Sequence, residues 1–378
     1  MDESEVKKFY NKNKSYCAMP FKEIYGDNAG RYRFCCHATE YEPIKKYTTT
    51  NTTPFDFFFS SEMEEVRNKM LSGEKIDACK VCYDLEKNNN ESYRTGKYKK
   101  KYGVDLEPKR IGLKLRIHGS YCNLGCYMCH PYNSSTRRNE LKKVFGNKSL
   151  TNWNAYQPLN HKQWNDSVND IINNIDKVAY MNITGGEPLQ LPGHWKLLDR
   201  IPDEHAKHIT LSYDTNLTEL EWKNKSIFDY VDKFEKINLG VSCDHYGKKE
   251  EWIRYPIDIK KFENNLKRAH NLIKQLNCTV SLLNVFDLSE IYDYYMNKFG
   301  IKTTFVNVCR GPEFLSVRNL KQKDKDMLLE KYKNFTDFSY FENEIRKHPT
   351  HEFDKLRTYC DSLSKHRNFD WKELWNEF

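Results

Sequence analysis

An alternation of short apolar runs and helical patterns extends from residue 111 to about residue 310. Helical stretches such as IKKFENNLKRAHNLIKQL separate these runs. Strands that alternate with helices pair in parallel through right-handed crossovers. The pattern therefore predicts an α/β fold, either an open sheet or a partial (β/α)6 barrel like that of a TIM barrel. The predicted strands are GLKLRIH (112–118), VAYMNIT (178–184), HITLSYD (208–214), KINLGVS (236–242), CTVSLLNVF (278–286) and KTTFVNV (302–308).

Polar motifs follow these predicted strands at the point where each strand ends. A three-cysteine loop (119–133) follows the first strand, TGGEP (184–188) the second and DTN (214–216) the third, and VSCDH (241–245) ends the fourth. Ligands of parallel sheets and barrels bind at the carboxyl ends of the strands. We therefore expect these motifs to meet on one face of the fold.

The regions on either side of the barrel pattern have a different character. Residues 1–108 form short segments broken by Cys, Gly and Pro, with one amphipathic helix at 60–73, as expected where metal–ligand bonds organise the chain. Residues 311–378 are mostly helical in pattern. We predict a small cysteine-rich domain (1–108), a barrel (109–310) and a helical C-terminal extension (311–378) that packs on the barrel.

The composition indicates how the twelve cysteines are used. The first residues are charged, and the chain has no run of 18 or more apolar residues, so we expect a cytoplasmic protein that has no membrane partner. In a reducing compartment, closely spaced cysteines are typical of metal ligands. The net charge is +8, and residues 94–110 contain seven Lys or Arg against two Asp or Glu. This segment favours a solvated linker, with a nucleic-acid contact as the alternative.

Three cysteines of the loop after the first strand, Cys122, Cys126 and Cys129, lie within eight positions. A structural zinc site needs a fourth ligand, for which His118 or His130 is the candidate. A [4Fe-4S] cluster on three cysteines instead keeps one iron that has no protein ligand, and a substrate or cofactor can bind there. The spacing alone leaves both alternatives open.

Together with TGGEP and VSCDH, this C-x3-C-x2-C loop resembles the radical S-adenosylmethionine (radical SAM) superfamily over about residues 111–310. The resemblance implies a SAM-binding [4Fe-4S] cluster on the three cysteines. It also implies that the glycine-rich turn contacts the SAM amino group and that Ser242 and Arg254 hold its carboxylate, which suits the bidentate guanidinium fork. The implied SAM-contacting residues are Met128, Gly185, Gly186, Glu187, Pro188, Ser242, Asp244 and Arg254.

The N-terminal cysteines show a second pattern, C-x12-G-x4-C from Cys17 through Gly30 to Cys35, followed by CKVC (79–82). This pattern resembles the twitch or SPASM domain, which follows the barrel in most radical SAM relatives but precedes it here. The resemblance implies an auxiliary [4Fe-4S] cluster on Cys17, Cys35, Cys79 and Cys82. Cys36 is the alternative to Cys35, and zinc is the alternative metal.

The resemblance implies a SAM-dependent iron–sulfur enzyme of the oxidoreductase or transferase type. Such an enzyme takes an electron from a reductant such as flavodoxin or ferredoxin, cleaves SAM to a 5′-deoxyadenosyl radical and removes hydrogen from its substrate. We expect a peptide or protein substrate. The alternatives are a nucleotide, a nucleic acid or a sugar metabolite, or a non-enzymatic iron–sulfur or zinc module. The one candidate catalytic side chain is Cys309, a hydrogen-atom donor or else a structural thiol.

Overall fold

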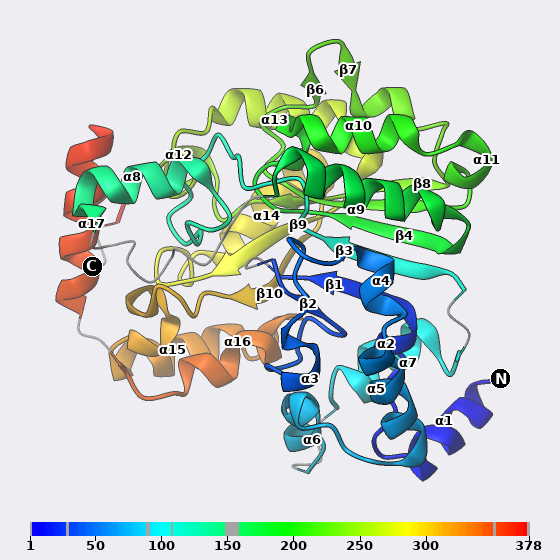
Figure 1. Cartoon of the computed structure of the whole chain (residues 1–378). Helices are drawn as coiled ribbons and strands as arrows, with labels where there is room; N and C mark the ends of the chain where they lie inside the picture. The colour runs from blue at the N-terminus through cyan, green and yellow to red at the C-terminus, as the bar shows by residue number, and fades with distance from the viewer. Residues whose placement is uncertain are drawn as a thin grey trace.

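The computed structural model describes residues 2–27, 30–87, 91–106, 109–147, 159–350 and 353–375. One large sheet runs through the centre of the molecule, with the N-terminal elements below it and helices on its outer side (Figure 1). The strands of this sheet are β1 (Glu23–Gly26), β2 (Tyr32–Arg33), β3 (Ile111–Leu115), β4 (Val178–Ile183), β5 (Thr210–Thr215), β8 (Lys236–Ser242), β9 (Ile273–Val280) and β10 (Thr303–Val308). A separate small hairpin pairs β6 (Glu221–Trp222) with β7 (Lys225–Ser226).

The strand order in the large sheet is β10-β9-β8-β5-β4-β3-β1-β2. The six strands from β3 to β10 are parallel to their neighbours and follow one another in chain order. Helices lie on the outer face of the sheet and connect these strands, except that the β6–β7 hairpin and a short 3₁₀ helix (Ile227–Tyr230) connect β5 to β8 (Figure 1). The predicted partial (β/α)6 barrel is therefore confirmed.

The described residues also form α-helices along the whole chain. They are α1 (Glu3–Lys12), α2 (Met19–Lys22), α3 (Glu42–Lys45), α4 (Pro54–Phe58), α5 (Ser61–Ser72), α6 (Lys80–Lys87), α7 (Lys99–Tyr102), α8 (Ser135–Phe145), α9 (His161–Asn173), α10 (Pro192–Arg200), α11 (Asp203–Ala206), α12 (Gly247–Ile253), α13 (Ile259–Arg268), α14 (Leu288–Phe299), α15 (Gln322–Tyr332), α16 (Phe338–Ile345) and α17 (Phe353–Arg367). Helix α5 confirms the helix predicted at 60–73: the Ser60 side chain caps its first turn, and Gly73 ends it in the left-handed conformation. In the described part of the chain, no helix is both long and apolar enough to span a membrane.

The two faces of the barrel sheet differ in polarity. The register aligns a polar layer in neighbouring strands, Lys114, Asn182, Ser212 and Asn238. The adjacent layer is apolar and buried, Leu113, Met181, Leu211 and Ile237. Side chains of a strand alternate between the two faces, so the apolar layer packs under the helices and the polar layer faces the barrel interior. The interior therefore suits polar ligands.

The N-terminal region contributes two strands to the same sheet. Strand β1 pairs in parallel with β3, and β2 pairs antiparallel with β1. Helix α4 also contacts the barrel, where the backbone N–H of Phe55 donates to Asp170 of α9 at 2.6 Å. The sheet thus continues across the boundary predicted at residue 108, which itself lies outside the described residues. β1 and β2 were not predicted because each is too short to show a periodic pattern.

The fifth predicted strand is displaced in the structure. β9 covers Ile273–Val280 instead of 278–286. The apolar run after Val280 forms a turn, because Ser281 N–H donates to Oδ1 of Asn284 and the Asn284 amide donates to the carbonyl of Thr279. The first half of β9 was missed because Gln275 and Asn277 are polar. A side-chain hydrogen bond joins them, Gln275 Nε2 to Asn277 Oδ1 at 2.7 Å.

Candidate functional site

A cavity of about 220 Å³ opens at the carboxyl ends of the barrel strands, and we call it the barrel cavity. It brings together residues of all four motifs that were predicted to share one face, and Arg254 as well. The residues on its wall are Arg116, Cys122, Leu124, Cys126, Cys129, Asn133, Thr184, Gly185, Gly186, Glu187, Asp214, Thr215, Asn216, Ser242 and Arg254. Residues from five segments separated by up to 138 positions therefore meet at one site.

Of the three cysteines on the wall of the barrel cavity, Cys122 and Cys126 are buried and Cys129 is half-buried. Burial raises the pKa of each thiol, to about 12 at Cys122. A metal or cluster that binds here must therefore displace three protons, and its positive charge would stabilise the three thiolates. Three thiols on one cavity wall fit an iron–sulfur cluster that leaves space beside it for a second ligand.

Buried arginines hold the backbone of the cysteine loop. Arg137 donates to the carbonyl of Tyr127 at 2.8 Å, and Arg367 of α17 donates to the carbonyl of Gly125 at 2.8 Å. Both guanidinium groups also pair with the buried Glu140 carboxylate. The C-terminal helix thus fixes the loop that carries the cysteines, a contact that the sequence did not predict.

The glycine-rich turn packs directly against the cysteine loop. Gly185 and Gly186 have φ angles of 98° and 58°, a region that favours glycine. A Cβ at Gly186 would lie 2.1 Å from the carbonyl oxygen of Tyr121, and the N–H of Glu187 donates to that same carbonyl at 2.7 Å. The two glycines therefore allow the glycine-rich turn to pack closely against the cysteine loop. This role is additional to any contact that they make with a ligand.

Glu187 is buried, and its carboxylate already has partners within the protein. Oε1 accepts from Thr215 Oγ1 at 2.6 Å and Oε2 from the N–H of Asn216 at 2.6 Å. Burial raises the pKa of Glu187 to about 7. Each carboxylate oxygen can accept more than one hydrogen bond, so a cationic group in the cavity can still bind here.

Arg254 is 7% exposed and is surrounded by acidic and sulfur atoms. Its Nη2 lies 2.7 Å from Asp244, its Nε 3.3 Å from Glu250 and its Nη1 3.6 Å from Sγ of Cys126. Asp244, which was expected among the cofactor-contacting residues, lies outside the cavity wall because it accepts from Thr279 N–H and pairs with Arg254. Arg254 and Ser242 do line the cavity.

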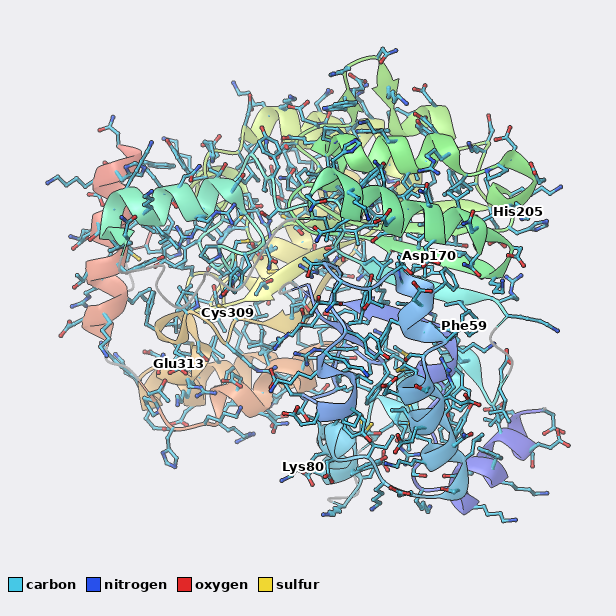
Figure 2. All side chains as sticks on the ribbon, viewed as in Figure 1. Phe59, Lys80, Asp170, His205, Cys309 and Glu313 are labelled. Carbon is cyan, nitrogen blue, oxygen red and sulfur yellow. The ribbon has the colours of Figure 1, made fainter. Side chains whose placement is uncertain are left out.

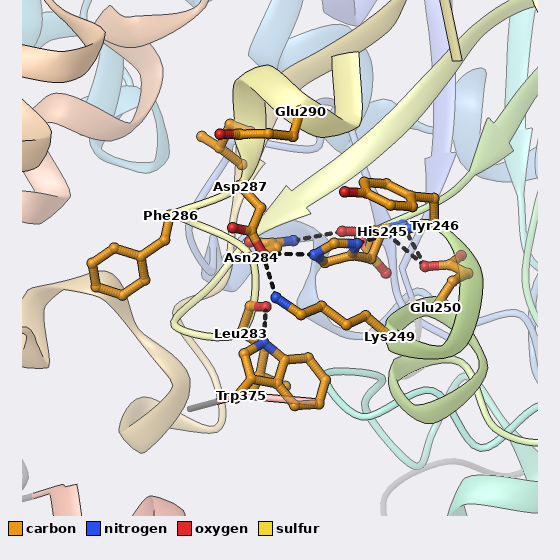
Figure 3. Close-up of polar contacts among 12 residues, drawn as sticks. His245, Tyr246, Lys249, Glu250, Leu283, Asn284, Phe286, Asp287, Glu290 and Trp375 are labelled. Atoms are coloured by element: carbon orange, nitrogen blue, oxygen red, sulfur yellow. Dashed lines mark hydrogen bonds and ion pairs between the residues drawn. The ribbon is translucent and has the colours of Figure 1, made fainter. Parts of the chain in front are cut away.

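A polar network beyond the end of β8 fixes this arginine site (Figure 3). Glu250 Oε2 accepts from the N–H groups of Asp244 and His245, at 3.0 and 2.7 Å. His245 Nε2 lies 2.9 Å from Asp287, which also pairs with Lys249 at 2.6 Å. The network anchors the turn after β8 to the start of α14.

The N-terminal cysteines line a second cavity, which we call the N-terminal cavity. It has a volume of about 20 Å³, and Cys17, Cys35, Cys79 and Cys82 all lie on its wall. Apolar groups such as Met19 complete most of its wall. Four cysteines are the number of protein ligands that a closed [4Fe-4S] cluster takes. Cys36 is absent from this wall and lines a different cavity.

Arg94 also lines the N-terminal cavity. It is buried, it pairs with Glu86, and its Nη1 donates to the carbonyl of Tyr16 at 2.8 Å. Lys101, from the same basic segment, pairs with the buried Glu23. Arg94 is thus held inside the protein, whereas the side chain of Lys101 is 41% exposed.

Residues 117–292 match the family model described as the Radical SAM superfamily. This segment contains the cysteine loop, the glycine-rich turn, Ser242 and Arg254. The chain carries a radical SAM domain. Radical SAM domains use a [4Fe-4S] cluster and SAM. No curated protein matches the chain by sequence.

Solved structures resemble the chain at low identity. One is native anSMEcpe with bound AdoMet and Cp18Cys peptide, at 20% identity and a TM-score of 0.42, over 63% of this chain and 62% of that chain. Another is Streptococcus suis SuiB bound to precursor peptide SuiA, at 14% identity and a TM-score of 0.37, over 84% of this chain and 53% of that chain. The chain spans less than two thirds of the length of each of these proteins.

Besides Asp244, three residues predicted to bind SAM or to act in catalysis lie away from the wall of the barrel cavity, namely Met128, Pro188 and Cys309. Met128 is half-buried against the core, and Pro188 is buried at the start of a short 3₁₀ helix. Cys309 is 3% exposed just after β10 (Figure 2), and its thiol donates to the carbonyl of Gly311 at 3.4 Å. Burial raises the pKa of Cys309 to about 12.

Asn216 and Arg116 line the barrel cavity but were not among the predicted site residues. Asn216 contacts Cys122 through an Nδ2–Sγ distance of 3.7 Å, and Arg116 donates to Asn133 Oδ1 at 3.0 Å. Asn216 belongs to the DTN motif that was noted at the end of a strand. Arg116 lies two residues after Lys114 and so continues the inward-facing side of β3, which is the signal that could have identified it.

Proposed function

We propose that this radical SAM enzyme removes a hydrogen atom from a peptide or protein substrate. In this proposal Cys122, Cys126 and Cys129 hold the SAM-binding cluster. Gly185, Gly186, Glu187, Ser242 and Arg254 position SAM beside it, and Cys17, Cys35, Cys79 and Cys82 hold an auxiliary cluster.

The observation that carries the proposal is the convergence of three cysteines, a glycine turn, a carboxylate and a guanidinium on one cavity. When bound, the cluster and SAM supply the 5′-deoxyadenosyl radical after one electron arrives from a reductant such as flavodoxin or ferredoxin. The chain's own residues orient that chemistry. Glu187 offers an acceptor to an ammonium group, and Ser242 and Arg254 offer donors to a carboxylate.

The polar interior of the barrel supports a peptide substrate. Asn182, Ser212 and Asn238 form one layer on the inner face of adjacent strands. Side-chain amides and hydroxyls pair well with the N–H and C=O groups of a peptide backbone, which must be satisfied when water is displaced. The nucleic-acid alternative rested on residues 94–110, where Arg94 and Lys101 are engaged in ion pairs within the protein.

The radical chemistry is tested with anaerobically purified, cluster-loaded protein. We expect about eight irons per chain for two [4Fe-4S] clusters, and 5′-deoxyadenosine after dithionite and SAM are added. A Cys126→Ala variant should keep about four irons and form no 5′-deoxyadenosine. Zinc in place of iron, or two intact clusters that do not cleave SAM, would contradict the proposal.

The substrate class is tested by isotope transfer. Peptides from a uniformly deuterated protein should transfer deuterium into 5′-deoxyadenosine, which mass spectrometry detects. Deuterated nucleotides, RNA fragments and sugars serve as matched controls under the same conditions. Deuterium transfer from one of these, and none from the peptides, would show that the substrate is not a peptide.

A further inference from the structure

A third cavity, of about 350 Å³, lies between the β1–β2 hairpin and the end of the cysteine loop. We call it the hairpin cavity. Tyr25, Arg31 and Arg33 form its wall on the hairpin side, and His130 and Tyr132 form the wall on the loop side. The His130 and Tyr132 rings lie 4.6 Å apart, so this side presents a continuous aromatic surface.

The hairpin cavity adjoins both proposed cluster sites. On one side, Cys129 and Asn133 line the barrel cavity while His130 and Tyr132, from the same five-residue segment, line the hairpin cavity. On the other side, Cys35 lines the N-terminal cavity. The next residue along the chain, Cys36, lines the hairpin cavity. A molecule bound here would lie between the source of the radical and the auxiliary cluster.

The hairpin arranges two guanidinium groups around one carboxylate. Oδ2 of Asp27 lies 2.9 Å from Nε of Arg31 and 3.1 Å from Nε of Arg33. The hairpin turn supports this geometry, since Oδ1 of Asp27 accepts from the N–H of Arg31 at 3.0 Å. On the cavity wall, two positive charges therefore face one negative charge.

The remaining donors of the two arginines differ in their partners. Nη1 of Arg33 donates to the carbonyl of Ala38, which is neutral, and Nη1 of Arg31 pairs with Glu40 at 2.6 Å. Glu40 is 56% exposed, and ion pairs with exposed groups are weak because water screens them. Nη2 of neither arginine has a hydrogen-bond partner among the described residues. Donors therefore remain for an anionic ligand.

We infer that the hairpin cavity binds the substrate and that Arg31 and Arg33 hold a carboxylate of it, from an acidic side chain or from a chain end. This inference rests on the proposed peptide substrate and deepens it. A planar carboxylate matches the guanidinium fork, and the ring faces of His130 and Tyr132 accommodate the neighbouring apolar part of the peptide. The auxiliary-cluster domain thus supplies the specificity of the site.

Cys36 provides a way to detect occupancy of this cavity. Its side chain is exposed and lines the cavity. In cluster-loaded protein the proposed ligand cysteines are bound to iron. Cys243, Cys278, Cys309 and Cys360 are buried. N-ethylmaleimide should therefore modify Cys36 first, and a ligand in the hairpin cavity should slow that modification.

The test measures the rate of Cys36 modification by peptide mapping, in cluster-loaded protein under anaerobic conditions. Three probes are titrated: acetyl-Gly-Glu-Gly-amide, acetyl-Gly-Gln-Gly-amide and acetyl-Gly-Gln-Gly with a free carboxyl end. We expect the Glu probe or the free-acid probe to protect Cys36 at a concentration about tenfold lower than the neutral amide does. A charge-assisted hydrogen bond to an arginine should strengthen binding of the acidic probe by about this factor. The acidic probe that protects Cys36 shows whether the carboxylate comes from a side chain or from a chain end.

Substitutions of Arg31 and Arg33 test whether these side chains, and not a general change in the protein, cause the stronger protection by the acidic probe. In Arg31→Gln and Arg33→Gln the advantage of the acidic probe should fall by about tenfold. Arg268→Gln, which removes an exposed arginine of α13 that pairs with Glu221, is the matched control and should behave as the unchanged protein. All three variants should still contain about eight irons per chain, which shows that they are folded and cluster-loaded.

Equal protection by the acidic and neutral probes, or no protection by any probe, would overturn the inference. So would an acidic-probe advantage that survives both Arg→Gln substitutions. None of these outcomes depends on SAM cleavage, so they are distinguishable from failure of the proposed radical chemistry, which the 5′-deoxyadenosine assay reports.

Discussion

Arg367, in the C-terminal helix, donates a hydrogen bond of 2.8 Å to the backbone carbonyl of Gly125, at the centre of the cysteine loop. The two residues are 242 positions apart. Arg367 is also paired with Glu140, and its Nη1 donates to the carbonyl of Trp252. The geometry of the proposed cluster ligands therefore depends on the last helix of the chain.

Substitution of Arg367 should disturb the cysteine loop. We expect Arg367→Met to lower the free energy of unfolding by about 3 kcal/mol, because the buried Glu140 loses one of its two cationic partners. Iron content should fall toward about four per chain, since the SAM-cluster site loosens while the N-terminal site is unaffected. Urea denaturation and iron analysis measure both effects. Arg346→Met, which removes an exposed pair with Glu342, should change stability by less than about 1 kcal/mol.

Two glycines with nearly the same backbone conformation provide a matched pair. Gly186 and Gly247 have φ angles of 58° and 56°. A Cβ added at Gly247 would meet no atom within 4 Å, whereas one added at Gly186 would lie 2.1 Å from the Tyr121 carbonyl oxygen. Gly247→Ala should cost about 1 kcal/mol of stability, from the backbone conformation alone. Gly186→Ala should cost more and should abolish SAM binding, measured by calorimetry on cluster-loaded protein. Equal effects at both positions would contradict the packing argument.

Cys35 and Cys36 are adjacent but line different cavities. Cys35→Ala should therefore remove the auxiliary cluster and leave about four irons per chain, whereas Cys36→Ala should keep about eight. Iron and sulfide analysis, with electron paramagnetic resonance of the reduced protein, measures the difference. If Cys36→Ala lost the auxiliary cluster and Cys35→Ala kept it, the ligand assignment would have to be exchanged.

The Asp287 network should contribute stability that depends on pH (Figure 3). Burial acts to raise the pKa of Asp287, but hydrogen bonds from His245 and Lys249 outweigh it and lower the pKa to about 2. The ionised form is thus favoured in the folded state. Its contribution, about 2 kcal/mol, is complete above the unfolded pKa of about 4 and is lost as the pH falls through 2.

Asp287→Asn tests this contribution. We expect the variant to be less stable than the unchanged protein by about 2 kcal/mol at pH 7 and at pH 5. The difference should shrink at pH 3.5, where the unfolded carboxyl is already protonated. Urea denaturation followed by tryptophan fluorescence provides the free energies. A difference that stayed constant down to pH 3.5 would show that packing, and not ionisation, is responsible.

Individual residues show how far the sequence could predict the site. The spacing of Cys122, Cys126 and Cys129 and the glycines of TGGEP placed these residues after particular strands, and the structure brings them to one cavity. The partner of Asp244 could not be predicted in this way. The Asp244 carboxylate contacts Arg254 and the N–H of Thr279 because of the way β8, β9 and α12 pack together. A short sequence motif does not encode that packing.

The sequence by itself determined the β/α alternation, the barrel class and the two cysteine sets, because periodicity and short spacings are local properties of a chain. Only the tertiary structure decided that β1 and β2 extend the barrel sheet, that Arg367 holds the cysteine loop, and that Arg31, Arg33 and Cys36 face a cavity beside it. These contacts join segments far apart in the chain. Their energies depend on burial and on the pairing of charges, which exist only once the sheet and its flanking segments have packed together.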